Sequence, residues 1–199
     1  MTARKVDGPV EKGLVSKPAR SIVLGVVVIF SALIAVGTIL SIPLPFPLYE
    51  ITWAPAIYMA LSVLAGPLPS LAATALGSFI GESYNIATRG GPPIFIAGIV
   101  WARAPEALII SWARNRRPRT IALAMVLGTI YEALAFFFPD WLFYAYGIFG
   151  YGNDNVGITS GFYAASFDFA TFLDLLYIPV AFAILRGARP AFRRLGFSV

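Results

Sequence analysis

The chain has 199 residues, of which 58% are hydrophobic and only 13% are charged, with a formal net charge of +5. An average soluble domain carries about 25% charged residues, so this composition predicts an integral membrane protein. Several spans of roughly 20 residues each leave no room for a soluble catalytic domain. The absence of Cys and His excludes thiolate chemistry, disulfides, Cys/His metal sites and Ser–His–Asp triads.

The chain begins with a polar, basic stretch, residues 1–20, which is predicted to be a cytoplasmic tail. A signal peptide is the alternative, but the apolar run that follows is too long for one and no A-x-A cleavage site comes after it. Proline and glycine clusters divide the rest into apolar segments. We therefore expect an all-α bundle of six transmembrane helices in the domain 21–185, over residues 21–42, 53–65, 70–87, 94–113, 121–138 and 162–185.

Two further segments complete the predicted organisation. Residues 139–161 form a loop of about twenty residues, rich in aromatic side chains, and long loops of this kind are usually functional. Residues 186–199 form a second basic cytoplasmic tail.

The distribution of positive charge predicts the orientation. Thirteen of the fifteen Lys and Arg residues lie in the two tails and in the segment between the fourth and fifth spans. Cytoplasmic segments are enriched in Lys and Arg, so an N-in, C-in, multi-pass protein of the cell membrane is predicted. The arginine-rich segment 114–119 is then a sign of topology rather than of nucleic-acid binding.

Charged residues also occur inside the predicted spans. A charge at the bilayer centre costs roughly 2.5 to 3.5 kcal/mol on insertion scales, so it needs a partner or a water-filled cavity. From the rise of about 1.5 Å per residue, Glu82, Glu132 and Asp168 lie roughly 8 to 9 Å below the outer surface. Arg103 lies about 14 Å deep, and Glu106 and Asp174 about 18 Å.

These matching depths allow two interpretations. In the first, the acids are paired internally, lie close to helix ends, or are protonated because burial raises a carboxyl pKa. Alternatively, they line an outward-opening cavity whose excess negative charge receives a cationic ligand. Trp101 could stack on a flat heterocycle or hold a cation over its ring, although most tryptophans at such positions belong to the interfacial belts. The predicted substrate-binding residues are Glu82, Trp101, Arg103, Glu106, Glu132, Asp168 and Asp174, with Glu50, Trp53 and Trp141 from the outer side.

Three stretches carry a resemblance to a known family: IPLPFPLYEITWAP, AGPLPSLAATALGSFIGE and GGPPIFIAGIVWARAPEAL. Together with six short spans in under 200 residues, they resemble the substrate-binding S component of an energy-coupling factor (ECF) transporter. The resemblance covers most of residues 30–113 and is diffuse beyond them.

The resemblance implies a membrane subunit that captures a vitamin-like micronutrient and docks on a transmembrane coupling protein with two ATP-binding subunits. Consistent with that division, the sequence contains no G-x-x-x-x-G-K-[ST] phosphate loop. The family's Ala-x-x-x-Ala docking face corresponds most nearly to Ser31-x-x-x-Ala35, with Ala32 and Gly37 beside it.

Substrate expectations also follow from the resemblance. The stretch around Glu106 is most similar to members that bind thiamine or its hydroxymethylpyrimidine precursor, so a cationic or amine-bearing heterocycle is expected. The cobalt and nickel members use an N-terminal histidine, which this chain lacks. A carboxylate ligand would need positive charge that Arg103 and Arg89 alone could provide.

Two other classes stay open at this point. One is a stand-alone proton- or cation-coupled carrier that uses the intramembrane acids as a relay. The other is an intramembrane enzyme or assembly factor, which the absence of His, Cys and a Gly-x-Gly-Asp motif disfavours. We therefore expect no enzymatic activity, no cofactor and no nucleic-acid partner.

Overall fold

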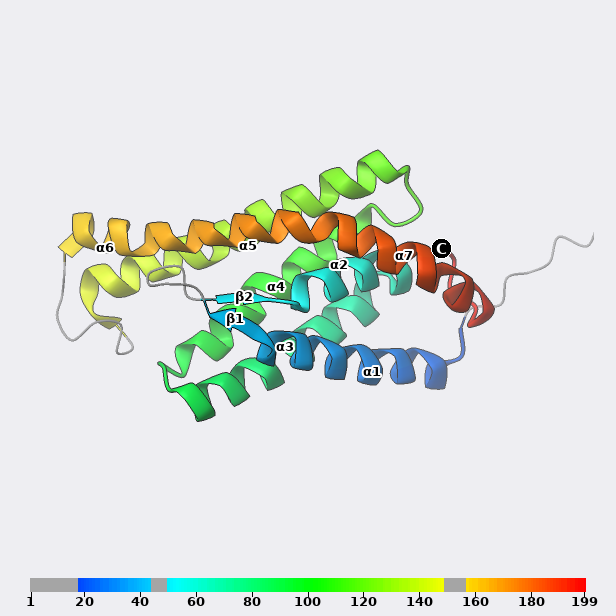
Figure 1. The fold of residues 1–199 in the computed structure, drawn as a ribbon, viewed down its shortest axis with the longest axis horizontal. Coiled ribbons are helices and arrows are strands. Elements are labelled where there is room, and N and C mark those ends of the chain that lie inside the picture. Colours follow the sequence, from blue (N-terminus) through cyan, green and yellow to red (C-terminus); the bar gives the residue numbers. More distant parts are fainter. Residues whose placement is uncertain (1–17, 44–49, 149–156) are drawn as a thin grey trace, which may run out of the picture.

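The computed structural model describes residues 18–43, 50–148 and 157–199. Helix α1 (Arg20–Ile39) leads into a short antiparallel hairpin of β1 (Ser41–Pro43) and β2 (Glu50–Thr52), in which Ile42 pairs with Ile51. Four helices follow, α2 (Ala54–Ala65), α3 (Pro67–Arg89), α4 (Ile94–Trp112) and α5 (Pro118–Tyr146). The chain ends in one long rod made of α6 (Gly157–Ala165), the 3₁₀ helix η2 (Ser166–Tyr177) and α7 (Ile178–Arg194) (Figure 1).

Within these described ranges, four helical segments are long and apolar enough to cross a membrane: α1, α4, α5 and the rod 157–194. Helix α2 is apolar but has only 12 residues, and α3 is not among the four. The prediction of a helical membrane protein is confirmed. The count of six spans, the N-in, C-in orientation and the multi-pass topology in the cell membrane stay predictions.

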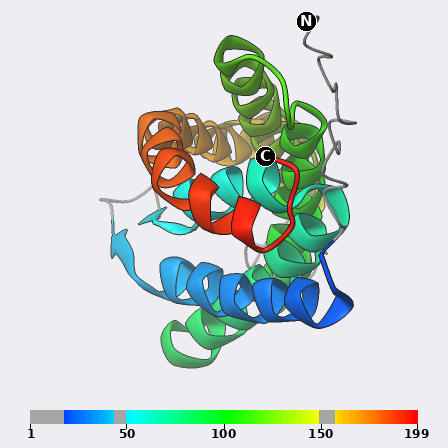
Figure 2. The ribbon, with the colours of Figure 1, turned by 90° about the vertical axis from the view of Figure 1, so that its right-hand side faces the viewer.

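Helix α2 lies in the middle of the bundle, and every one of its residues except Ile57 is buried. It packs against α7, α1, α3 and α4, so it is surrounded by the longer helices (Figure 2). Proline at its first turn and Gly66 at its end, with φ of 86°, set its boundaries. Its short length is therefore compatible with a wholly internal position.

Small residues allow α1 and α3 to pack closely side by side. A Cβ atom on Gly77 would lie 2.7 Å from both the Ile34 Cβ and the Ser31 carbonyl oxygen, and one on Gly81 would lie 2.6 Å from the Thr38 Cβ. Close helix approach over small residues is the usual packing mode inside membranes.

Several predicted boundaries differ from the structure. Helix α5 continues through Pro139 to Tyr146, into the segment predicted as a loop. Aromatic packing accounts for the extension, because Phe137 stacks on Phe169 with ring centroids 4.9 Å apart and Trp141 Nε1 donates to the Ile158 carbonyl at 2.9 Å. The last helical segment begins at Gly157, before residue 162, and continues beyond residue 185 to Arg194. The longer α5 and the earlier start of this segment shorten the predicted loop from both ends.

The C-terminal segment after α7 packs back onto the bundle. Phe197 is 4% exposed and its ring lies 5.2 Å from that of Phe192. Arg114 Nε donates to the Ser198 carbonyl at 3.1 Å, and Arg114 Nη1 donates to the Ala65 carbonyl at 3.2 Å. The end of the chain therefore belongs to the packed core.

Substituting Phe197 tests this packing. Phe197→Leu removes three buried carbon atoms and should lower the free energy of unfolding by about 2 kcal/mol at roughly 0.8 kcal/mol per buried carbon. The half-exposed Leu195 nearby provides the control, and Leu195→Ala should change stability far less. Unfolding of the detergent-solubilised protein, followed by tryptophan fluorescence, measures both. Equal effects would show that the segment is not packed as described.

Candidate functional site

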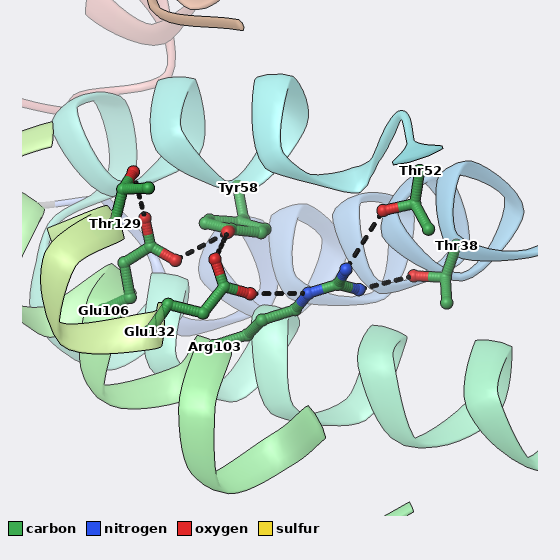
Figure 3. A network of polar contacts seen from close by, with 7 residues as sticks. All are labelled: Thr38, Thr52, Tyr58, Arg103, Glu106, Thr129 and Glu132. Atoms are coloured by element: carbon green, nitrogen blue, oxygen red, sulfur yellow. Dashed lines mark hydrogen bonds and ion pairs between the residues drawn. The ribbon is translucent and has the colours of Figure 1, made fainter. Parts of the chain in front are cut away.

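A network of buried polar side chains centres on Arg103 of α4, which is 6% exposed. Its Nε donates to Glu132 Oε1 of α5 at 3.1 Å, within an ion pair. Its Nη1 donates to Thr38 Oγ1 of α1 at 3.2 Å, and its Nη2 donates to Thr52 Oγ1 of β2 at 3.0 Å (Figure 3). One guanidinium group thus joins α1, β2, α4 and α5, which suits its planar arrangement of five donors.

The network continues from Glu132 to Tyr58 of α2. The Tyr58 hydroxyl lies 3.2 Å from Glu132 Oε2 and 2.6 Å from Glu106 Oε2. Thr129 Oγ1 donates to Glu106 Oε1 at 3.4 Å. Tyr58 and Glu106 are 0% exposed and Glu132 is 1% exposed, so these groups exchange hydrogen bonds with one another rather than with bulk solvent.

Beside this network lies a cavity of about 720 Å³. Its wall includes residues from β2, α3, α4, α5 and η2. Five carboxyl groups line it, those of Glu82, Glu132, Asp140, Asp168 and Asp174, together with the guanidinium groups of Arg89 and Arg103. Apolar side chains such as Phe95, Ile99 and Phe136 cover the remainder. The volume is in the range that binds a small organic molecule.

The structure brings together five of the residues predicted from the sequence. Glu82 comes from α3, Arg103 from α4, Glu132 from α5, and Asp168 and Asp174 from η2, and all line the cavity. Helices that are distant in sequence therefore place their acidic side chains on the wall of one cavity.

Glu106 is close to the cavity but does not line it. It is fully buried and is held by Tyr58 and Thr129. Glu106 does not line this cavity, and its direct contact with a ligand stays a prediction. Its cavity-lining neighbour is Glu132, which it contacts directly and through Tyr58.

The predicted tryptophans also lie outside the wall. Trp101 is 62% exposed on the outer face of α4, and Trp53 packs on Tyr177 with ring centroids 5.7 Å apart. Trp141 is bonded to the Ile158 carbonyl. None of the three lines this cavity, so their role in substrate binding stays a prediction that the cavity does not support. The side chain of Glu50 lies outside the described part of the chain.

The predicted docking motif is mostly internal. Ser31 and Ala35 are 6% and 5% exposed, and Gly37 is buried against Ala54 and Ile57. Only Ala32 of this group is exposed. Helices α3 and α2 cover Ser31, Ala35 and Gly37 in this arrangement, so a docking face built on them stays a prediction that this packing does not support.

Several residues of the site were not anticipated from the sequence. Asp140 falls in the segment 139–161 that was predicted as a loop, and Tyr58 falls in the predicted span 53–65, for which only Trp53 was named as a site residue. Asn85 is 5% exposed and lines the cavity, where its Nδ2 donates to the Thr38 carbonyl at 3.4 Å. The sequence signal that could have identified Asp140, Tyr58 and Asn85 is that each is a polar residue within an otherwise apolar helix.

Two acceptor atoms on the cavity-lining residues have no hydrogen-bond partner. Asn85 Oδ1 belongs to α3, and Asp168 Oδ2 belongs to η2. A buried acceptor without a donor costs about 1 to 3 kcal/mol. Both atoms could accept a hydrogen bond from an N–H or O–H group of a molecule in the cavity. Among the described residues, no group of three or more acidic side chains is arranged to hold a metal ion.

Comparisons with protein-family models, curated proteins and solved structures find no match to this chain. The function is therefore inferred from the residues of the site.

Proposed function

We propose that this protein is the substrate-capture subunit, or S component, of an ECF-type importer for a small cationic or amine-bearing molecule such as a vitamin-like heterocycle. The observation that supports the proposal is the cavity of about 720 Å³ with five carboxyl groups and two guanidinium groups on its wall. Acidic groups inside an apolar bundle are costly and mark ligand or ion pathways in membrane proteins.

The charge balance favours a cation. Arg103 is already engaged by Glu132 and two threonines, and Arg89 donates to Ser41 Oγ and the Ile39 carbonyl. The acids outnumber these two guanidinium groups on the wall. Electrostatic attraction is strong in a cavity of low dielectric constant, so a cationic ligand gains more there than on the protein surface.

The proposed partners are the lipid bilayer, a transmembrane coupling protein and ATP-binding subunits. The sequence contains no phosphate-binding loop of its own, so energy from ATP would come from those subunits. Thiamine and its pyrimidine precursor are the first ligands to examine, since the resemblance points to them and both carry amino groups.

A stand-alone proton- or cation-coupled carrier is the second candidate. The continuous chain of contacts from Glu106 through Tyr58 to Glu132 and Arg103 favours it, because such a chain could carry a proton to the cavity wall (Figure 3). The two candidates differ in their energy source, and uptake by the purified protein alone in liposomes under a pH gradient would select the carrier.

Ligand binding tests the capture function. The purified protein should be stabilised by at least one amine-bearing heterocycle in a thermal-shift panel that includes thiamine, and the same compound should appear by mass spectrometry after purification. Asp168→Asn should weaken its binding about 2- to 10-fold, because it replaces an oxygen of the carboxyl group whose Oδ2 has no partner with an amide nitrogen, at roughly 0.5 to 1.5 kcal/mol for one neutral hydrogen bond.

Trp101→Ala is the matched control. Its exposed side chain lies outside the cavity wall, so this variant should bind as the wild type does. Co-purification of the wild type with a coupling protein and ATP-binding subunits separates the S component from the carrier. Absence of both ligand binding and these partners would reject the proposal.

A further inference from the structure

The hydroxyl group of Tyr58 contacts two carboxyl groups but has one proton. It lies 2.6 Å from Glu106 Oε2 and 3.2 Å from Glu132 Oε2, both within or close to the distances of O–H···O hydrogen bonds. A phenol can donate to only one acceptor at a time. The second contact is a hydrogen bond only if the other carboxyl group is protonated and donates to the phenol oxygen.

The surroundings of the two carboxyl groups decide which one is protonated. Glu132 accepts from Arg103 Nε at 3.1 Å, and this ion pair stabilises its carboxylate form. Glu106 has no guanidinium contact and is 0% exposed; besides Tyr58 it contacts the neutral Thr129 and the carboxyl group of Glu132. Two carboxyl groups in contact form a hydrogen bond only if one of them is protonated. A buried carboxylate without a cationic partner is strongly disfavoured.

We propose that Glu106 is a proton-binding site behind the cavity wall and that Tyr58 relays its proton to Glu132. In the resting arrangement Glu106 donates to the Tyr58 oxygen, Tyr58 donates to Glu132 Oε2, and Thr129 donates to Glu106 Oε1. This assignment satisfies every contact in the series with one donor each (Figure 3).

The transfer step is balanced in protons and charge. The O–H bond of Glu106 breaks as its proton binds the Tyr58 oxygen, and the original phenol proton passes to Glu132 Oε2. Glu106 becomes a carboxylate, Glu132 becomes neutral, and the total charge of the group is unchanged. In the transferred state the negative charge lies behind the cavity wall, which would loosen a cation bound beside Glu132. This state is short-lived, because it leaves Glu106 as a buried carboxylate without a cationic partner.

Charged and titratable groups from each surrounding element bear on this equilibrium. They are Tyr58 of α2, Arg103 of α4, Glu132 of α5 and Asp174 of η2. Glu132, Arg103 and Asp174 line the cavity whereas Tyr58 and Glu106 do not. Protons from the cavity therefore enter at Glu132, which contacts both Tyr58 and Glu106. The inference depends on these contacts and not on the identity of a transported molecule.

Infrared spectroscopy of the full-length protein in lipid, with ¹³C-labelled glutamate, tests the proton site. The difference spectrum between Glu106→Gln and wild type at neutral pH should show loss of one protonated-carboxyl band of glutamate. Loss of a carboxylate band instead would overturn the proposal, because it would show that Glu106 is ionised.

Tyr58→Phe tests the relay, and it also tests the proton site if Glu106→Gln does not fold. The Glu106 band should persist in Tyr58→Phe at a higher frequency, since its acceptor is gone, and its hydrogen–deuterium exchange in D₂O should slow at least tenfold. Exchange at the wild-type rate would overturn the relay. An unshifted band would overturn the Glu106–Tyr58 hydrogen bond on which the site depends. Neither readout requires that the protein bind a vitamin, so failure here is distinguishable from failure of the capture function.

Discussion

Replacing Arg103 with glutamine should destabilise the folded protein by about 3 to 5 kcal/mol, the range for removing one partner of a buried ion pair. The variant leaves Glu132, 1% exposed, without its cation, and it removes the donors to Thr38 and Thr52. Those donors join α1 and β2 to α4. The loss should appear as a large decrease in the thermal unfolding midpoint of the purified protein in detergent.

Two variants show whether the unpaired charge is the cause. Arg103→Gln combined with Glu132→Gln should regain much of the lost stability, because no buried charge is left uncompensated. Arg89→Gln is the matched control, since Arg89 also lines the cavity but its bonds to Ser41 and Ile39 are exposed. Equal destabilisation by Arg103→Gln and Arg89→Gln would contradict the central role of Arg103.

The helical segments were predictable because apolar composition and proline–glycine breaks act locally. Their ends were predictable only where local signals decide them, as at Gly66 and Gly90, whose φ angles of 86° and 83° suit glycine. The end of α5 was not predictable in this way. Pro139 indicates a break in the helix, but Phe137 and Trp141 pack against α6 and η2, and the helix continues. Tertiary packing overrides the local signal there.

Three of the five acids that line the cavity have matching depths in the sequence-based prediction. The rise along a helix places Glu82, Glu132 and Asp168 at one level, and they line one cavity. Depth carries no information about the direction in which a side chain points. Trp101 lies two residues from Arg103, about 200° around the helix, so one faces the network and the other is exposed.

The predicted docking motif is mostly buried inside the bundle, and the sequence could not show this because it does not reveal which helix a small residue contacts. Small residues favour close helix contact whether the neighbouring helix belongs to the same chain or to a partner. Sequence alone cannot separate these cases. The structure pairs Ser31 and Ile34 of α1 with Gly77 of α3, so the motif is used for internal packing.

This internal packing leads to the second large effect, that of Gly77→Leu. A Cβ at this position would lie 2.7 Å from the Ser31 carbonyl oxygen and from the Ile34 Cβ, so the backbone of α1 would have to move. Overpacking a core costs about 1 to 3 kcal/mol when side chains alone adjust. We expect a larger loss for Gly77→Leu, seen as aggregation on gel filtration or a strongly lowered unfolding midpoint.

Gly98→Leu is the control for helix propensity and added hydrophobic surface. Gly98 also lies within an apolar helix, α4, but no atom is within 4 Å of a Cβ placed there. Because leucine has a higher helix propensity than glycine, this variant should be as stable as the wild type or more stable. If Gly77→Leu were tolerated equally well, α1 and α3 could not be packed as the structure shows. Thr38 of α1 and Asn85 of α3 would then lose their fixed positions beside Arg103 and the cavity.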